Sequence, residues 1–208
     1  MNKFFSHIKQ ILLIQIFIII SFFVYFNANS DESSKNFNSI YIGDDNAPVE
    51  IKIYSSLTCP HCANFHLKVV TKIEEKYVKS GKVKIVFIDF PLDIAALNAA
   101  KILHCVEKDN QMNILDLIYK KQSKWATGNT IEEINEKLKQ ITTSSGINPE
   151  KIDKCFADED IENKVLSARI EGRKKYSINS TPTIIINEKK FTGTQSFEDI
   201  EKIIKKNI

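Results

Sequence analysis

Cysteine is scarce in this chain, and its scarcity limits the sites that the sequence can build. Four cysteines occur among 208 residues, and only Cys59 and Cys62 stand close together. The other two, Cys105 and Cys155, are far apart in the sequence. A structural zinc site usually takes four ligands, often from two tight pairs. The absence of a second tight pair therefore argues against such a site.

The chain also has little net charge. Lysine and arginine total 29, and aspartate and glutamate total 26, which gives a formal net charge of +3. Leaving out Lys3 and Lys9 of the N-terminal segment reduces the 29 basic residues to 27 against 26 acidic ones, a charge of +1. Nucleic-acid-binding domains carry marked basic patches. This balance therefore favours no nucleic-acid partner.

Acidic residues are absent from the N-terminal segment, residues 1–30. Two lysines precede an apolar run over residues 11–26, and the small-residue sequence Ala28-Asn29-Ser30 follows. This order is typical of a secretory signal peptide. The run is long for a signal peptide but shorter than the ~20 residues that span a bilayer, so an N-terminal membrane anchor stays open as the alternative. Either segment directs the rest of the chain out of the cytoplasm, to a compartment where disulfides persist.

The most informative stretch is a short strand that runs into the close pair of cysteines. Val49, Ile51 and Ile53 recur at the period of a half-buried strand. The segment Cys59-Pro60-His61-Cys62 follows, and apolar residues then recur at helical spacing towards Gly81. The first cysteine thus lies at a predicted helix start, where free N–H groups and the helix dipole stabilise a thiolate. His61 can add positive charge there.

A redox-active dithiol is the function that this strand–cysteine–helix pattern favours. Two alternatives stay open. Cys59, Cys62 and His66 could supply three ligands to a metal ion, or the two cysteines could be an inert buried pair. For His61 the plain alternative is a solvated spacer, and for His66 it is a position on the helix face without a ligand role.

Apolar patterns divide the remaining chain into three parts. Within residues 31–91, a second apolar strand at 82–88 completes a strand–helix–strand unit. Residues 92–175 carry helical apolar stripes and no convincing strand. Residues 176–208 return to a strand at 183–186, a tight turn, a second strand and a last helix.

Four segments together carry a resemblance to a known family. They are Gly43-Asp44-Asp45-Asn46-Ala47-Pro48-Val49, Cys59-Pro60-His61-Cys62, Phe90-Pro91-Leu92 and Ser180-Thr181-Pro182-Thr183. With the strand before the cysteines, they resemble the DsbA-like thiol:disulfide oxidoreductases of the thioredoxin superfamily. The resemblance implies an α/β, thioredoxin-like fold with an inserted all-helical subdomain. Residues 31–91 and 176–208 would form the two parts of the thioredoxin-like domain, and residues 92–175 the insertion.

The resemblance also implies an activity. The chain would be a periplasmic dithiol oxidase that donates the Cys59–Cys62 disulfide to exported, cysteine-containing proteins, with Cys59 attacked and Cys62 resolving the mixed disulfide. The central Pro60-His61 is associated with oxidising members. A quinone-linked membrane oxidase would recharge the pair, and the protein would act as a monomer with neither a cofactor nor a metal.

Further roles follow from the resemblance for residues far from the pair. Thr181 and a cis Pro182 would lie beside the cysteines and modulate the active site. Cys105 and Cys155 could be two unrelated thiols, but in an exported chain a structural disulfide is expected, as in DsbA-like proteins of some alphaproteobacteria. Ile53 departs from the pattern of the family, because the best-known members have a buried acidic residue at this position that serves as a proton relay.

Two other functions stay open. A disulfide isomerase or reductase of the same fold would use the same cysteines. Isomerases of this kind carry a long N-terminal dimerisation domain, whereas only a short polar segment separates Ser30 from Ile40. A periplasmic metal-binding chaperone would instead use Cys59, Cys62 and His66.

Overall fold

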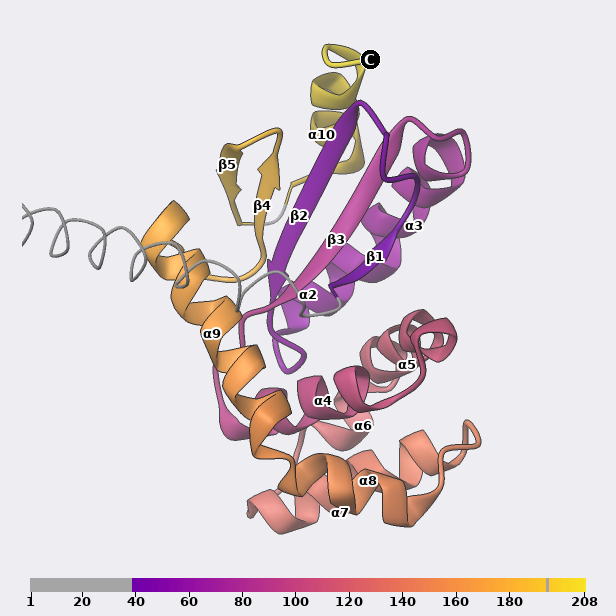
Figure 1. Ribbon diagram of the computed structural model, residues 1–208, viewed down its shortest axis with the longest axis vertical. Coiled ribbons are helices and arrows are strands. Elements are labelled where there is room, and N and C mark those ends of the chain that lie inside the picture. The colour runs from indigo at the N-terminus through magenta and orange to yellow at the C-terminus, as the bar shows by residue number, and fades with distance from the viewer. Residues whose placement is uncertain (1–38, 194) are drawn as a thin grey trace, which may run out of the picture. The chain divides into compact units, whose positions relative to one another are not determined.

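A computed structural model describes residues 39–193 and 195–208 of the chain (Figure 1). The segment 1–30, for which the sequence predicts a signal peptide or membrane anchor, lies outside the described residues. Within the described residues, no helix is long and apolar enough to cross a membrane.

Five strands form one mixed sheet in the order β1-β3-β2-β4-β5. The strands β2 and β3 are parallel, and each of the other neighbouring pairs is antiparallel. Every residue of β4 is buried, as its run of isoleucines leads one to expect of a central strand. The strand bounds are β1 (Ile40–Ile42), β2 (Val49–Ser55), β3 (Val83–Asp89), β4 (Thr183–Ile186) and β5 (Lys189–Thr192).

One helical segment links β2 to β3 and begins with the cysteine pair. It consists of α2 (Pro60–Phe65), η1 (His66–Val70), α3 (Thr71–Ile73) and η2 (Glu74–Val78), and η1 and η2 are π-helical. The sequence predicts an ordinary amphipathic helix here, so the π-helical turns are a difference. Its buried apolar residues stand four apart, more than the 3.6 residues of an α-helical turn, and the wider π turns keep them on one face. These residues are Phe65, Val69, Ile73 and Tyr77.

The chain between β3 and β4 is helical, with no strand among its residues, all of which are described. Four of its six helices begin at a residue whose side chain accepts a backbone N–H, the usual N-cap arrangement: Asp93, Thr130, Asn148 and Asp158. The bounds are α4 (Ile94–Cys105), α5 (Lys108–Lys120), α6 (Gln122–Trp125), α7 (Ile131–Thr143), α8 (Pro149–Ala157) and α9 (Glu159–Tyr176). After β5, α10 (Phe197–Lys205) ends the fold.

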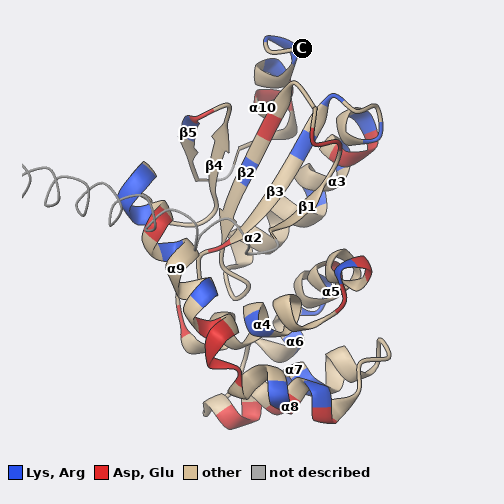
Figure 2. Cartoon of the chain, in the orientation of Figure 1, with Lys and Arg blue, Asp and Glu red and all other residues tan. Residues whose placement is uncertain are grey.

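Charged residues of both signs are interspersed along α7, α8 and α9 (Figure 2). One lysine is turned inward instead. Lys101 of α4 is 2% exposed, and its Nζ lies 2.7 Å from Oε2 of Glu162 on α9. This ion pair joins the first and last helices of the helical block.

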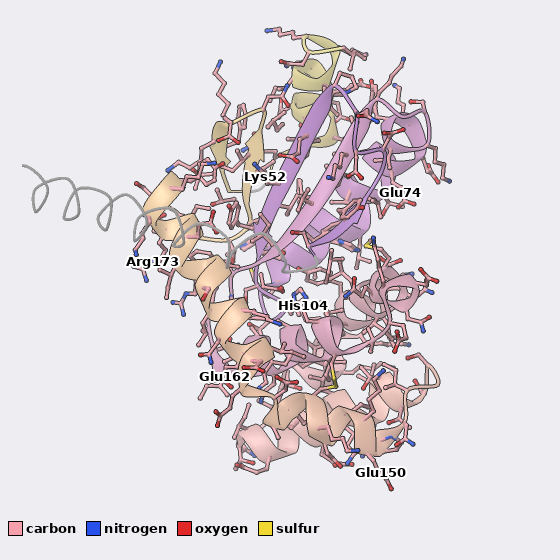
Figure 3. The ribbon with its side chains drawn as sticks, viewed as in Figure 1. Lys52, Glu74, His104, Glu150, Glu162 and Arg173 are labelled. Carbon is pink, nitrogen blue, oxygen red and sulfur yellow. A yellow bond between two sulfur atoms is a disulfide. The ribbon has the colours of Figure 1, made fainter. Side chains whose placement is uncertain are left out.

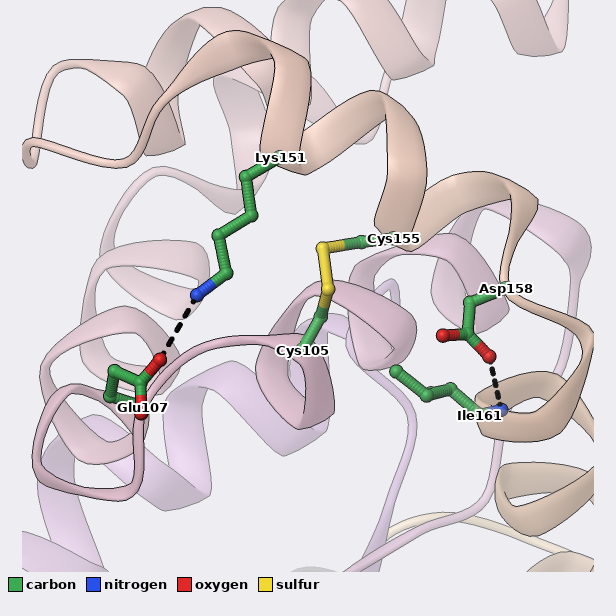
Figure 4. Close-up of a disulfide and its surroundings, with 6 residues drawn as sticks. All are labelled: Cys105, Glu107, Lys151, Cys155, Asp158 and Ile161. Carbon is green, nitrogen blue, oxygen red and sulfur yellow. Dashed lines mark hydrogen bonds and ion pairs between the residues drawn. A yellow bond between two sulfur atoms is a disulfide. The ribbon is translucent and has the colours of Figure 1, made fainter.

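A disulfide between Cys105 and Cys155 joins the end of α4 to α8 (Figure 4). Their Cα atoms are 5.7 Å apart, and the bond spans 50 positions of the chain. An exposed ion pair lies nearby, with Lys151 Nζ 3.3 Å from Glu107 Oε1. The disulfide, rather than this solvent-screened pair, is the strong link between the two helices.

Replacing Cys105 and Cys155 together by serine should lower the melting temperature. A loop of this length gives about 4 kcal/mol of stabilisation in the chain-entropy model, and we expect a fall of roughly 5–15 °C for a protein of this size. Calorimetry of the oxidised wild type and double variant measures it. If the double variant kept the wild-type melting temperature but lost disulfide exchange at Cys59, a structural role of the Cys105–Cys155 disulfide would be contradicted.

Candidate active site

Cys59 is the N-cap residue of α2, and Pro60 occupies the first helical turn. The backbone of Cys59 is extended (φ −77°, ψ 118°), and its N–H donates to the carbonyl of Ser56 at 3.1 Å. Proline suits this position because it lacks the N–H that a first turn leaves unpaired. Cys59 is partly exposed, whereas Cys62, one turn further on, is buried. The two sulfurs therefore differ in their access to substrate.

The helical block holds the loop that precedes Cys59. The side-chain amide of Gln122 in α6 donates to the carbonyls of Leu57 and Cys59 at 2.8 and 3.0 Å. Thr58 Oγ1 donates to Oδ2 of Asp93, the N-cap of α4, at 2.7 Å. The sequence does not predict the roles of these three polar side chains, because their partners are distant in the chain and no local pattern indicates that Gln122 binds the loop.

The loop before β4 completes the site. The Thr181–Pro182 peptide bond is cis, and Cys59 Sγ lies 3.6 Å from the Thr181 carbonyl oxygen, to which the thiol donates when it is protonated. The hydroxyl of Thr181 is buried and has no hydrogen-bond partner within standard distances. Pro60 and His61 are exposed. The structure thus brings Thr181 and Pro182 to the cysteine pair and leaves the Pro60-His61 dipeptide open to solvent.

The two thiols have different pKa values. A hydrogen bond from the Cys62 thiol is the largest cause that lowers the pKa of Cys59, to about 5. The Thr181 side chain, although its hydroxyl lies beyond standard hydrogen-bond distance of any partner, and the backbone N–H groups of Cys62 and His61 lower this pKa further, and together these groups outweigh the cost of burial. The same hydrogen bond and burial raise the pKa of Cys62. Cys59 is therefore a thiolate at neutral pH, while Cys62 keeps its proton.

His66 lies inside the fold rather than on an open helix face. It is buried, its Nε2 lies 2.7 Å from Oδ1 of Asp116, and its ring packs 4.8 Å from that of Tyr119. Among the residues that the structure describes, no group of three or more histidine, cysteine, aspartate or glutamate side chains is placed to hold a metal ion. The alternative set of Cys59, Cys62 and His66 is not assembled.

Comparisons with known proteins agree with this geometry. A family model described as Thioredoxin matches residues 35–206. A putative protein-disulfide oxidoreductase of Rickettsia bellii is 27% identical over 151 residues, which cover 72% of this chain and 57% of that protein. A probable disulfide bond formation protein D of Bacillus cereus is 27% identical over 177 residues, 80% of this chain and 77% of that protein.

A solved structure is also similar. The crystal structure of Wolbachia pipientis alpha-DsbA1 is 28% identical and has a TM-score of 0.76, covering 82% of this chain and 90% of that one. The chain spans about three fifths of the length of the Rickettsia relatives that it matches, from 57% to 61% in three of them.

Replacing Thr181 by valine should raise the pKa of Cys59. In the wild type, alkylation by iodoacetamide should stay fast until the pH falls through about 5, because the folded protein lowers that pKa. Valine keeps the shape but removes the hydroxyl that stabilises the thiolate. Because this hydroxyl lies beyond standard hydrogen-bond distance, its effect is smaller than the about 1.5–3 kcal/mol of a hydrogen bond to a charged group, and we expect a rise of about one pKa unit or less. Alkylation rates across pH measure it.

Thr183→Val is the matched control. Its hydroxyl, two residues further on, donates to the Ser180 carbonyl at 2.8 Å rather than to a sulfur. This variant should keep the wild-type pH profile. An equal shift in both variants, or a wild-type profile that follows an ordinary thiol pKa near about 8.5, would refute the assignment.

Proposed function

We propose a function on the premise that this chain belongs to the thioredoxin family whose model matches residues 35–206. The relatives and the Wolbachia structure confirm that it is a DsbA-like member of the thioredoxin superfamily. They also confirm the expected α/β, thioredoxin-like fold with helical content inserted between its strands. Residues 92–175 would be the inserted subdomain, between the domain parts 31–91 and 176–208.

The proposed activity is dithiol oxidation of proteins by the Cys59–Cys62 disulfide. A substrate thiolate attacks Cys59 Sγ, the bond between the two cysteines breaks, and Cys62 leaves with the electron pair. A second substrate thiolate then attacks the same substrate sulfur, and Cys59 leaves. The product is a substrate disulfide, and two electrons remain on the enzyme dithiol.

The observation that carries this proposal is the low pKa of Cys59, about 5, beside a Cys62 whose pKa is raised. A thiolate stabilised in the reduced protein makes the disulfide a stronger oxidant and Cys59 a better leaving group. Partial exposure of Cys59 lets it accept attack, while burial of Cys62 keeps the second sulfur from substrate. The asymmetry favours donation of a disulfide.

Pro60, His61, Thr181 and Pro182 would modulate this reaction. The backbone N–H of His61 contributes to thiolate stabilisation. The carbonyl of Thr181 lies against Cys59, so the loop at Thr181-Pro182 would pair with an extended substrate segment, as a strand edge does. Cys105 and Cys155 would serve structure only.

The substrates would be exported proteins with cysteines, and the location would be the periplasm. Residues 1–30 would be the export signal or an anchor to the inner membrane. A quinone-linked membrane oxidase would recharge the pair, as the DsbA-like resemblance implies. The protein would act as a monomer and would need no cofactor of its own.

Replacing Cys62 by serine should trap substrates. Without the second thiol, the mixed disulfide at Cys59 cannot be resolved within the enzyme. Non-reducing gels of periplasmic extracts should show conjugates of the Cys62→Ser protein that dithiothreitol removes. Conjugates of a Cys59→Ser protein at the same level would reverse the assigned roles.

The reduction potential should separate an oxidase from a reductase of the same fold. We expect a value more positive than the about −180 mV of protein disulfide isomerase and closer to the about −120 mV of DsbA. Equilibration of the purified protein with glutathione buffers measures it. A value near the about −270 mV of thioredoxin would indicate a reductase instead.

A further inference from the structure

Gln122 is a buried polar side chain of α6 that reaches the loop carrying Cys59. Side chains fill the space between the sheet and the helical block (Figure 3), and Gln122 is 8% exposed. Its amide nitrogen lies 2.8 Å from the carbonyl oxygen of Leu57 and 3.0 Å from that of Cys59. A side-chain amide has two N–H bonds to donate. Gln122 therefore spends its whole donor capacity on one short loop.

The Cys59 carbonyl has particular need of this second donor because proline follows it. The same oxygen accepts the backbone N–H of Ala63 at 3.1 Å, the first hydrogen bond of α2. Pro60 has no N–H, so the peptide group between Cys59 and Pro60 can be held by hydrogen bonds only through its oxygen. Within the described residues, Gln122 supplies the only side-chain hydrogen bond to that oxygen.

The orientation of this peptide group affects the charge on the sulfur. A peptide group is a dipole, with its positive end at the N–H and its negative end at the carbonyl oxygen. The oxygens of Leu57 and Cys59 are bound at the Gln122 amide, whereas the backbone N–H groups of His61 and Cys62 lower the pKa of Cys59. A peptide rotated towards Sγ would bring a negative end to the thiolate and displace the first turn of α2. Holding the two oxygens at Gln122 therefore favours the charged sulfur.

The helix that carries Gln122 is itself anchored in the helical block. Trp125, one turn after Gln122, is fully buried, and its Nε1 donates to the Ile118 carbonyl of α5 at 2.9 Å. A side chain can fix the geometry of a reacting group only if its own position is fixed by its surroundings. The buried tryptophan gives Gln122 such a position.

Resting on the proposed dithiol oxidation, we propose that Gln122 is a positioning residue of this reaction: it holds the carbonyls of Leu57 and Cys59, keeps the first turn of α2 directed at Cys59 Sγ, and so makes Cys59 a better leaving group. The relevant step is the second one. A substrate thiolate attacks the substrate sulfur of the mixed disulfide, the bond from that sulfur to Cys59 breaks, and its electron pair goes to Cys59. Cys59 leaves as a thiolate without taking up a proton. Gln122 acts on this thiolate through the backbone.

Other groups that act on Cys59 or its loop stay in place when Gln122 is replaced. They come from α2, from the loop before β4 and from α4, and they are Cys62, Thr181 and Asp93. The two lysines of α6, Lys121 and Lys124, are exposed, so solvent and salt screen their charges. A change in the acidity of Cys59 on replacing Gln122 can therefore be assigned to the lost amide.

The test is the acidity of Cys59 in two variants of nearly unchanged side-chain size. Gln122→Met keeps the length of the side chain but has no donor, and Gln122→Glu places a charged acceptor against two carbonyl oxygens. We expect the pKa of Cys59 to rise by about one unit in the first variant and further in the second. Iodoacetamide alkylation rates of the reduced proteins across pH measure it. A wild-type profile in Gln122→Met, whatever Gln122→Glu shows, would overturn the proposal.

The redox equilibrium is a second readout, and one that a purely structural role would not move. If the pKa of Cys59 rises from about 5 to about 6, thiolate stabilisation of the reduced protein at about pH 7 falls roughly ninefold. The disulfide of Gln122→Met should then be a weaker oxidant by nearly the same factor, and a tenfold change corresponds to about 30 mV. Equilibration with glutathione buffers measures it. A wild-type potential in Gln122→Met would overturn the proposal.

Gln111→Met is the matched control. Gln111 of α5 is 6% exposed, close to the value for Gln122, but its side chain makes no hydrogen bond to residues 56–59, all of which the structure describes. This variant should keep the alkylation profile of Cys59, and an equal shift in both methionine variants would overturn the proposal. Trapping of substrates by Cys62→Ser in an otherwise unchanged chain tests the exchange itself. Failure of the positioning role is therefore distinct from failure of the proposed function.

A measurement on the unmodified protein covers variants that do not fold. Side-chain amide resonances of the reduced wild type are followed by NMR while Cys59 titrates near about pH 5. The Gln122 amide should shift with that titration, because it binds the backbone of the titrating residue, and the Gln111 amide should not. A Gln122 amide that does not respond would also overturn the proposal.

Discussion

Stabilisation of one negative charge, on Cys59 Sγ, sets demands on several distant parts of the chain. The start of α2 supplies backbone N–H groups, Cys62 supplies a thiol donor, and the loop before β4 supplies the hydroxyl of Thr181. These donors stabilise the thiolate only if the junction between β2 and α2 has a fixed geometry. Because charge–dipole interactions fall off within one helical turn, the position of the Cys59 backbone decides how acidic its thiol becomes.

The helical block provides that positional control. Gln122 and Asp93 hold the loop at Leu57 to Cys59 from two different helices. The disulfide between Cys105 and Cys155 joins α4, the helix that Asp93 caps, to α8, and the buried ion pair of Lys101 joins α4 to α9. An insertion between β3 and β4 is therefore more than a cover over the sheet. It sets the geometry of the strand-to-helix junction that carries the chemistry.

The sequence predicted those parts of the site whose causes are local. The alternation of Val49, Ile51 and Ile53 and the position of the cysteines at a helix start both depend on neighbours within a few residues. The cis Pro182 came from resemblance alone, since base rates favour a trans bond. The roles of Gln122 and Asp93 could not be predicted in this way, because a polar side chain of a helical segment is ordinarily solvated and only the tertiary fold turns it inward.

Asp89, the last residue of β3, is a buried carboxylate near the cysteine end of the sheet. Ile53, where the sequence lacks an acidic residue, is buried on β2 and pairs with Phe87 of β3. Ser55 and Asp89 form the next row on the same face, towards the cysteine end of the sheet. His104 Nε2 lies 2.6 Å from Oδ2 of Asp89, and this hydrogen bond offsets the desolvation of the carboxylate. Parallel pairing of β2 with β3 brings Asp89 beside Ser55 although the two residues are far apart in the sequence, which is why no local pattern could predict that they are neighbours.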